Sequence, residues 1–319
     1  MRYIDKNINK EAGNQVTLDY LNAHCKDASG HYGGVRYSTK DAGTNPIFLT
    51  SGSPNTYYSR MVDILMRDQK ERCCYCLRKL QPSPAANTDA KISIEHIVPH
   101  SFKHADYAKF AEYKSFTHNL DEVVLTDDFE SMDPQTIPPY PHTVAYENMV
   151  VSCNGTFPAV REGGRANSQI CCNHKRGAER ALPVYFLNDI ANHIVYLNTG
   201  DVQANASSPQ CSAVDEVIKH ADLGCDSLCV IRKIWYELSA LDLSNIIQCD
   251  TEDKREKLLT EAFNNTLAMT DPIATADLIE KFKKQDYWET LMLYDAFYDI
   301  MKAKYRATVQ NSNNTSATS

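Results

Sequence analysis

The chain has 319 residues, 43% of them hydrophobic, and carries a formal net charge of -8 at pH 7. This length and composition suffice for a substantial buried core and suggest one large or two modest domains. The negative balance argues against a protein that coats nucleic acid non-specifically, because phosphate binding depends on positive charge.

The first seven residues lack the apolar segment of a secretory signal, and no window approaches the roughly 18 apolar residues of a membrane span. We therefore expect a cytoplasmic protein without a membrane partner. No GxxxxGK[ST] phosphate loop occurs, so we do not expect the chain to hydrolyse nucleotides itself. Several of the 11 cysteines cluster at short spacings near histidines, which favours metal thiolates over disulfides.

Residues 57–80 are predicted to form a helix that runs into a CCYC knuckle at residues 73–76, because apolar residues recur there at helical spacing. The knuckle should begin a hairpin whose return strand is 91–96. Glu95 and His96 end that strand, on opposite faces unless it bends. The four prolines within 127–143 predict an irregular insertion, and the acidic cluster inside it is interpreted as a solvated loop.

A short apolar stretch at 148–151 leads to Cys153. Residues 155–167 are predicted to form a mobile loop, and Asn173 should open a helix that runs toward Leu182. Together with the strand at 91–96, these segments predict a strand–strand–helix unit split by insertions.

From residue 184 onward the composition favours helices, so we expect an all-helical second half with a polar linker at 200–212. An apolar stripe over 277–306 predicts a helix that faces the core or a partner. The polar residues near the C-terminus are expected to be disordered.

A zinc ion held by four thiolates needs ligands delivered in pairs from tight turns. Cys73 and Cys76 have the two-residue gap that permits this, and Cys153 with Cys172 is the second pair that we predict. Cys172 is preferred over Cys171 because it directly precedes a candidate catalytic residue, but the choice between the two stays open. Ordinary buried thiols are the alternative interpretation.

Glu95 and Asn173 are predicted to bind Mg²⁺ or Mn²⁺ through hard oxygen atoms, and His174 is a replacement or additional ligand. His96 is the candidate general base, because imidazole accepts a proton near neutral pH. Asn148 is expected to brace the loop around His96. Together these residues predict metal-dependent hydrolysis of phosphodiester bonds.

Basic residues surround both cysteine segments, and we expect some of them to contact the phosphates of nucleic acid, with DNA favoured over RNA. A solvated surface is the alternative interpretation of these charges. The candidate contacts are Arg72, Lys79, Arg165, Lys175 and Arg176.

The pattern formed by Cys73 and Cys76, EHIVP at 95–99, EN at 147–148 and CNHKRG at 172–177 resembles the HNH endonucleases of the ββα-metal class. In that family the residue before the histidine binds metal, the histidine is the base, and the final Asn or His completes the metal site. The resemblance implies these roles for Glu95, His96 and Asn173. It also implies an α+β, mostly α fold with a ββα-metal core, insertions, a structural zinc and a C-terminal helical domain.

The start MRYIDK, the pairing of CCYC with IEH, and residues 223–235 are similar to the PtuB family, the HNH nucleases of Septu and retron-associated anti-phage systems. This resemblance implies a role in prokaryotic antiviral defence and a PtuA-like ATPase partner.

We accordingly expect a nuclease domain at 1–183 with its core at 70–183 and an N-terminal extension at 1–69, a partner-docking helical domain at 184–308, and a tail at 309–319. Homo-oligomer formation stays open. The alternative functions are a non-catalytic zinc-ribbon module that binds nucleic acid or protein, and a stand-alone HNH nuclease of restriction type.

Overall fold

The computed structural model describes residues 1–39, 45–49, 56–80, 92–153, 155, 171–177, 179–240 and 293–316, with single positions at 251, 254 and 257. Within these residues the protein is a mixed α+β structure that is mostly helical. This confirms the predicted fold class at that level.

The N-terminal region contains two helices, α1 (Lys10–His24) and α2 (Tyr57–Asp68). One face of α2 is buried, as its apolar periodicity predicts. The predicted helix over 57–80 is too long, because Lys70 and Glu71 adopt positive φ angles of 51° and 57°. A right-handed helix cannot pass through this left-handed conformation, so the chain turns there into the knuckle.

A two-stranded antiparallel sheet carries Glu95 and His96. Strand β1 (Ile92–His96) pairs with β4 (Met149–Cys153), so that His96 lies opposite Met149. Every residue of β4 is buried. Helix α5 (Cys172–Arg176) packs against β4, which gives the order strand, strand, helix that the sequence predicts.

Two details of this unit differ from expectation. In the described residues the knuckle does not pair with β1: Arg72 and Lys79 form a bridge with each other, and β4 is the partner of β1. Helix α5 ends at Arg176 and does not reach Leu182. Its C-cap, Gly177, has a φ of 54° and a ψ of -124°, a positive-φ conformation that glycine adopts without steric cost.

The chain between β1 and β4 forms a small folded insertion. It contains α3 (Tyr107–Phe116), β2 (Val123–Val124), α4 (Thr126–Met132) and β3 (Tyr140–Pro141), with 3₁₀ turns at His104–Asp106, His118–Leu120 and Tyr146–Asn148. The predicted irregular segment and acidic loop are therefore wrong over α4 and β3. Asp127 and Asp128 lie in the first turn of α4, where carboxylates complement the helix dipole, and Phe129 anchors the helix in the core.

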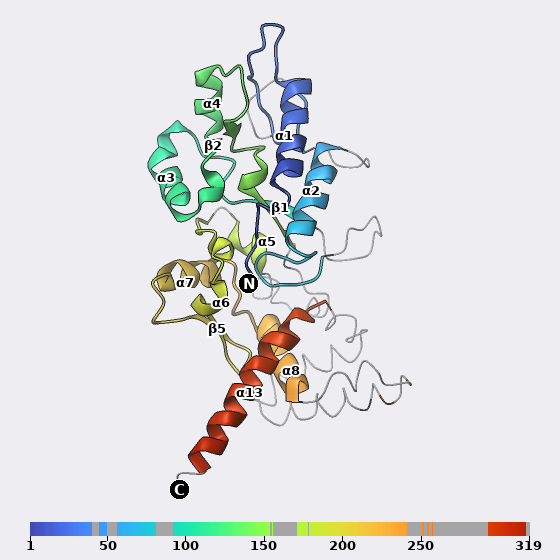
Figure 1. The fold of residues 1–319 in the computed structure, drawn as a ribbon, viewed down its shortest axis with the longest axis vertical. Coiled ribbons are helices and arrows are strands. Elements are labelled where there is room, and N and C mark those ends of the chain that lie inside the picture. Colours follow the sequence, from blue (N-terminus) through green and yellow to red (C-terminus); the bar gives the residue numbers. More distant parts are fainter. Residues whose placement is uncertain are drawn as a thin grey trace, which may run out of the picture.

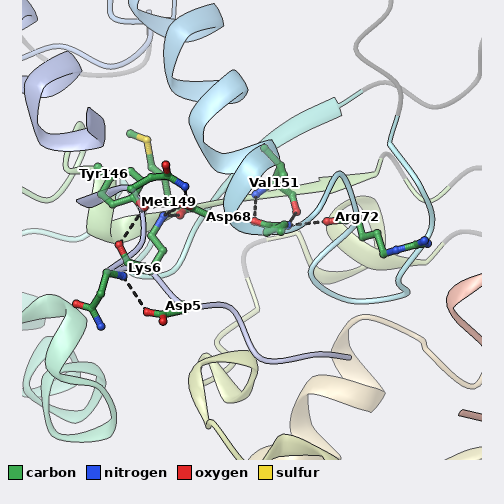
Figure 2. Close-up of polar contacts among 10 residues, drawn as sticks. Asp5, Lys6, Asp68, Arg72, Tyr146, Met149 and Val151 are labelled. Carbon is green, nitrogen blue, oxygen red and sulfur yellow. Dashed lines mark hydrogen bonds and ion pairs between the residues drawn. The ribbon is translucent and has the colours of Figure 1, made fainter. Parts of the chain in front are cut away.

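A buried polar network fastens the N-terminal segment and α2 to β4 (Figure 2). The Nζ of Lys6, which is 2% exposed, donates to Met149 O at 2.9 Å and lies 3.4 Å from Asp68 Oδ2. Tyr146 OH donates to the same carboxylate oxygen at 2.6 Å. Burial lowers the pKa of Lys6 to about 8, against the opposing charge of Asp68.

Gln69 forms a second connection between α2 and β4. Its Nε2 donates to Val151 O at 2.7 Å, and its Oε1 accepts from Val151 N–H at 2.8 Å. The same Nε2 also donates to Arg72 O at 2.7 Å, which reaches the start of the knuckle (Figure 2). These satisfied buried groups fix β4 relative to α2 and the knuckle.

The second half is mixed rather than all-helical. It contains a 3₁₀ turn at Val184–Phe186, α6 (Ile190–His193), α7 (Cys211–His220), α8 (Asp226–Ala240) and α13 (Ala296–Ser316), with a hairpin of β5 (Ile194–Tyr196) and β6 (Val202–Ala204). The polar linker predicted at 200–212 is too long: β6 and the start of α7 lie within it, and only residues 205–210 between them are turns without regular structure. In β6, Val202 and Ala204 are buried and Gln203 is exposed.

The apolar stripe predicted over 277–306 lies partly outside the described residues, as does the predicted loop apart from Gly155. From residue 293 onward, Tyr294, Phe297 and Met301 are buried, and α13 packs on α8. Helix α13 continues through Ser316, into the segment expected to be disordered.

The molecule is elongated, with α1 to α4 toward one end of its long axis, α5 near the middle, and α6, α7, α8 and α13 toward the other end (Figure 1). Among the residues described, no helix combines the length and apolar character needed to cross a bilayer.

Candidate metal centre and catalytic cleft

Four buried cysteines meet where the knuckle, β4 and α5 come together. The Sγ atoms of Cys73, Cys76, Cys153 and Cys172 all lie within 4.8 Å of one another, and those of Cys76 and Cys153 are 3.7 Å apart. In a tetrahedral site with Zn–S bonds of about 2.3 Å, the sulfur atoms are about 3.8 Å apart. This group can therefore hold a zinc ion, and it consists of the four cysteines chosen from the sequence.

Backbone contacts bring the cysteine segments together. Cys74 N–H donates to Val151 O at 3.2 Å, which attaches the knuckle to β4. Cys171 N–H donates to Gly155 O at 3.2 Å, and a Cβ at Gly155 would collide with Cys171 O. Only glycine permits this close approach, because Gly155 also has a positive φ of 71°.

The surroundings act on the cysteines in opposite directions. Hydrogen bonds from Cys171 and Cys172 lower the pKa of the Cys153 thiol to about 5, whereas burial raises the pKa values of Cys76 and Cys172 well above the ordinary value. Cys171 is not one of the four, although its Sγ lies 3.3 Å from that of Cys172. Burial alone would lower the pKa of Arg78, but the nearby Tyr294 and Cys153 raise it overall. This buried guanidinium offsets part of the negative charge of the thiolates.

Glu95 is 4% exposed and is held by two partners. Arg176 Nη1 forms an ion pair with Glu95 Oε1, and Tyr75 OH donates to the same oxygen at 3.4 Å. Burial raises the pKa of Tyr75 well above its ordinary value of 10, so Tyr75 stays protonated and remains a donor.

His96 is 8% exposed and lies at the end of β1. Its Nε2 is 3.0 Å from Thr143 O, and a carbonyl oxygen only accepts hydrogen bonds. In the neutral imidazole the proton therefore lies on Nε2 and the lone pair on Nδ1, which is the form that a general base requires. The ring of Tyr37 packs edge-on against His96 with 4.5 Å between ring centroids, and that of His100 lies 5.5 Å away.

Asn148 is fully buried and connects the turn after β1 to the segment before β4. Its Oδ1 accepts from Val98 N–H at 2.7 Å, and its Nδ2 donates to Val98 O at 3.0 Å and to His142 O at 2.8 Å. These contacts suit a brace for the loop around His96, which is the role expected from the sequence.

Glu95, His96 and Asn173 line a single cleft of about 530 Å³. Asn173 is half-buried, and its Nδ2 donates to Ser93 Oγ at 2.8 Å, which leaves the amide oxygen as its metal-binding atom. A carboxylate and an amide oxygen form the hard donor set that suits Mg²⁺. The side chain of His174 lies outside the described part of the structure.

The basic residues predicted to contact nucleic acid are mostly engaged with acids. Lys79 is exposed, and Arg165 lies outside the described residues. The other three form ion pairs: Arg72 with Asp295 at 2.7 Å, Lys175 with Asp222 at 3.3 Å, and Arg176 with Glu95.

The N-terminal extension supplies one wall of the cleft, which sequence reasoning missed. Tyr37, Leu49 and Tyr58 line it beside the three candidate catalytic residues. The backbone of this wall is fixed by Tyr20, whose hydroxyl accepts from Arg36 N–H at 3.1 Å. No local motif connects this aromatic segment to residue 96, so no sequence signal was available to place it at the site.

Comparison of the chain with protein-family models, with curated proteins and with solved structures gave no match.

Proposed function

We propose that this protein is a metal-dependent endonuclease of the HNH type that hydrolyses phosphodiester bonds of nucleic acid. The observation that carries the proposal is the convergence of Glu95, His96 and Asn173 on one cleft, beside a buried group of four cysteines. A carboxylate, an amide oxygen and an imidazole with its lone pair on Nδ1 are the groups that metal-assisted hydrolysis needs.

In this proposal, Glu95 and the amide oxygen of Asn173 hold Mg²⁺ or Mn²⁺. When bound, such an ion neutralises the charge that develops on the leaving oxygen. His96 Nδ1 takes a proton from the attacking water, while Nε2–H stays bonded to Thr143 O. That carbonyl fixes the orientation of the ring and stabilises the imidazolium that forms.

The four cysteines would hold a structural zinc that keeps the knuckle, β4 and α5 together. Because Cys172 directly precedes Asn173, the position of the amide ligand depends on this centre.

The proposal extends to prokaryotic antiviral defence, with a PtuA-like ATPase as partner, on the strength of the motif resemblance. Co-expression with such an ATPase followed by purification of one protein tests the partnership. Stable co-purification supports it, whereas full nuclease activity of the isolated chain favours a stand-alone restriction-type enzyme.

The test of the nuclease is cleavage of plasmid DNA and total tRNA with and without Mg²⁺, by the wild-type protein and by His96→Ala. Loss of the general base should reduce cutting by roughly 100-fold or more. His118→Ala is the matched control, because the His118 side chain is 99% exposed and pairs only with Asp121 at 3.3 Å among the contacts recorded for it. All proteins must carry equal zinc. Mg²⁺-dependent cutting that survives in His96→Ala contradicts the assignment.

One observation favours a second candidate, a non-catalytic zinc module. Glu95 and Arg176 neutralise each other, and Arg72 and Lys175 are also paired with acids. This candidate predicts binding of nucleic acid or protein without cutting. Absence of cleavage even with the partner ATPase would support it.

A further inference from the structure

The ion pair between Arg176 and Glu95 puts a fixed cation on the carboxylate to which the proposed function assigns the metal. We propose that Arg176 is an internal competitor for the divalent ion and passes from Glu95 to the substrate phosphate when the site is loaded. This inference rests on the proposed function and specifies how metal and substrate binding are coupled.

The placement of Arg176 supports both of its positions. It lies three residues after Asn173 in α5, so the two residues share one helical face, and both line the cleft. Its side chain is 5% exposed, with Nη1 on Glu95 Oε1, while its Nε is buried and has no hydrogen-bond partner within the described part of the chain. A buried donor left unpaired is costly, and a phosphate that enters the cleft can accept from it.

The chemistry of the guanidinium suits an exchange between two anions. Its planar fork donates parallel hydrogen bonds to a carboxylate or to a phosphate equally well. The other donor recorded for Glu95, Tyr75 OH, is neutral and so does not repel a metal ion.

A divalent ion that reaches Glu95 in the free protein must displace a charge-assisted pair, which weakens its binding. A phosphate that draws Arg176 away removes this competition. Metal and phosphate should therefore strengthen each other's binding by the same factor. The enzyme would then hold its metal firmly only when nucleic acid is present.

The experiment measures Mn²⁺ affinity of the full-length, zinc-loaded protein by electron paramagnetic resonance of free Mn²⁺, without nuclease turnover. Arg176→Gln should bind Mn²⁺ about tenfold more tightly than wild type, which corresponds to about 1.4 kcal/mol. Lys175→Gln removes the same charge from the neighbouring residue, which pairs with Asp222 at the surface, and should change the affinity by less than about twofold. Glu95→Gln should abolish the site.

A second measurement repeats the titration with a phosphorothioate-linked thymidine dinucleotide. In the wild-type protein the dinucleotide should tighten Mn²⁺ binding by about fivefold or more, and in Arg176→Gln most of this gain should disappear. No gain in the wild-type protein overturns the exchange, and this result needs no variant.

The outcomes separate the two proposals. Unchanged or weaker Mn²⁺ binding in Arg176→Gln, with the site still lost in Glu95→Gln, overturns the role of Arg176 and leaves the metal site standing. Equal Mn²⁺ binding in all proteins, including Glu95→Gln, overturns the metal site and with it the proposed function. If Arg176→Gln does not fold, Arg176→Lys replaces it. Lysine keeps the charge but lacks the planar fork, so tighter Mn²⁺ binding than wild type is expected, and unchanged binding contradicts the inference.

Discussion

Mild acid should destabilise this protein through one buried histidine next to the cleft. His142 is 0% exposed, and Thr126 N–H donates to its Nδ1 at 2.9 Å. Burial, reinforced by the charge of His96, lowers the pKa of His142 from 6.5 to about 3. In the unfolded chain His142 therefore binds a proton once the pH falls below 6.5. In the folded chain it does so only near pH 3. The contribution of neutral His142 to the unfolding free energy is therefore fully present above pH 6.5 and is lost as the pH falls toward 3.

The size of the effect follows from the two pKa values. Over the whole window the shift corresponds to about 5 kcal/mol of unfolding free energy, and between pH 8 and pH 5 to about 2 kcal/mol. The variant His142→Asn removes the titration, while its amide oxygen can still accept from Thr126 N–H. The wild-type protein should therefore lose about 2 kcal/mol more than His142→Asn between these two pH values.

Urea unfolding of both proteins at pH 8 and pH 5 measures this double difference. Titrating groups remote from His142 are common to both proteins and cancel in it. His118→Asn is the control for replacing a histidine at the surface, because the His118 side chain is 99% exposed. A double difference below about 0.5 kcal/mol would refute the argument, since it would show that His142 titrates almost normally in the folded protein.

Two further predictions concern the four-cysteine group and Asn148. Cys172→Ser should reduce the zinc content well below one ion per chain and lower the melting temperature, whereas Cys211→Ser, at the partly exposed start of α7, should do neither. Elemental analysis measures the zinc and calorimetry the melting temperature. A full zinc content in Cys172→Ser would exclude Cys172 as a ligand. Asn148→Ala removes three buried hydrogen bonds to Val98 and His142, so it should lower the free energy of unfolding in urea by about 3 kcal/mol and slow cleavage. An unfolding free energy equal to that of the wild type would argue against a bracing role for Asn148.

The parts of the site that were predictable from sequence are those whose chemistry is local. Cys73 and Cys76 have ligand spacing within one turn, and Glu95 and His96 are adjacent, so their grouping needs no knowledge of the fold. The grouping of Cys73 and Cys76 with Cys153 and Cys172 was predicted from the order of the motifs along the chain.

Charge was less predictable than position. Arg176 can be recognised as basic from the sequence, but whether it is free depends on tertiary contacts, and in the structure Glu95 already holds it. Arg72 likewise pairs with Asp295, far along the chain. Counts of charged residues cannot reveal such pairs.

Short elements were the hardest to predict. Helix α4 has seven residues and directly precedes a proline-rich segment, so the prolines led to the prediction of an irregular structure over both. Strands β5 and β6 have three residues each, too few for the alternation that marks a strand.

The cysteine centre is bordered on two sides by the second half of the chain. Lys79 N–H, next to the knuckle, donates to Leu293 O at 2.6 Å, and Cys172 N–H donates to Ala221 O at 2.8 Å. A fragment that stops at residue 183 would lose both acceptors and expose these backbone groups to water. The composition suggests a domain boundary at that point, but residues of the second half supply hydrogen-bond acceptors to the segments that hold the cysteines. The protein should therefore not be divided there.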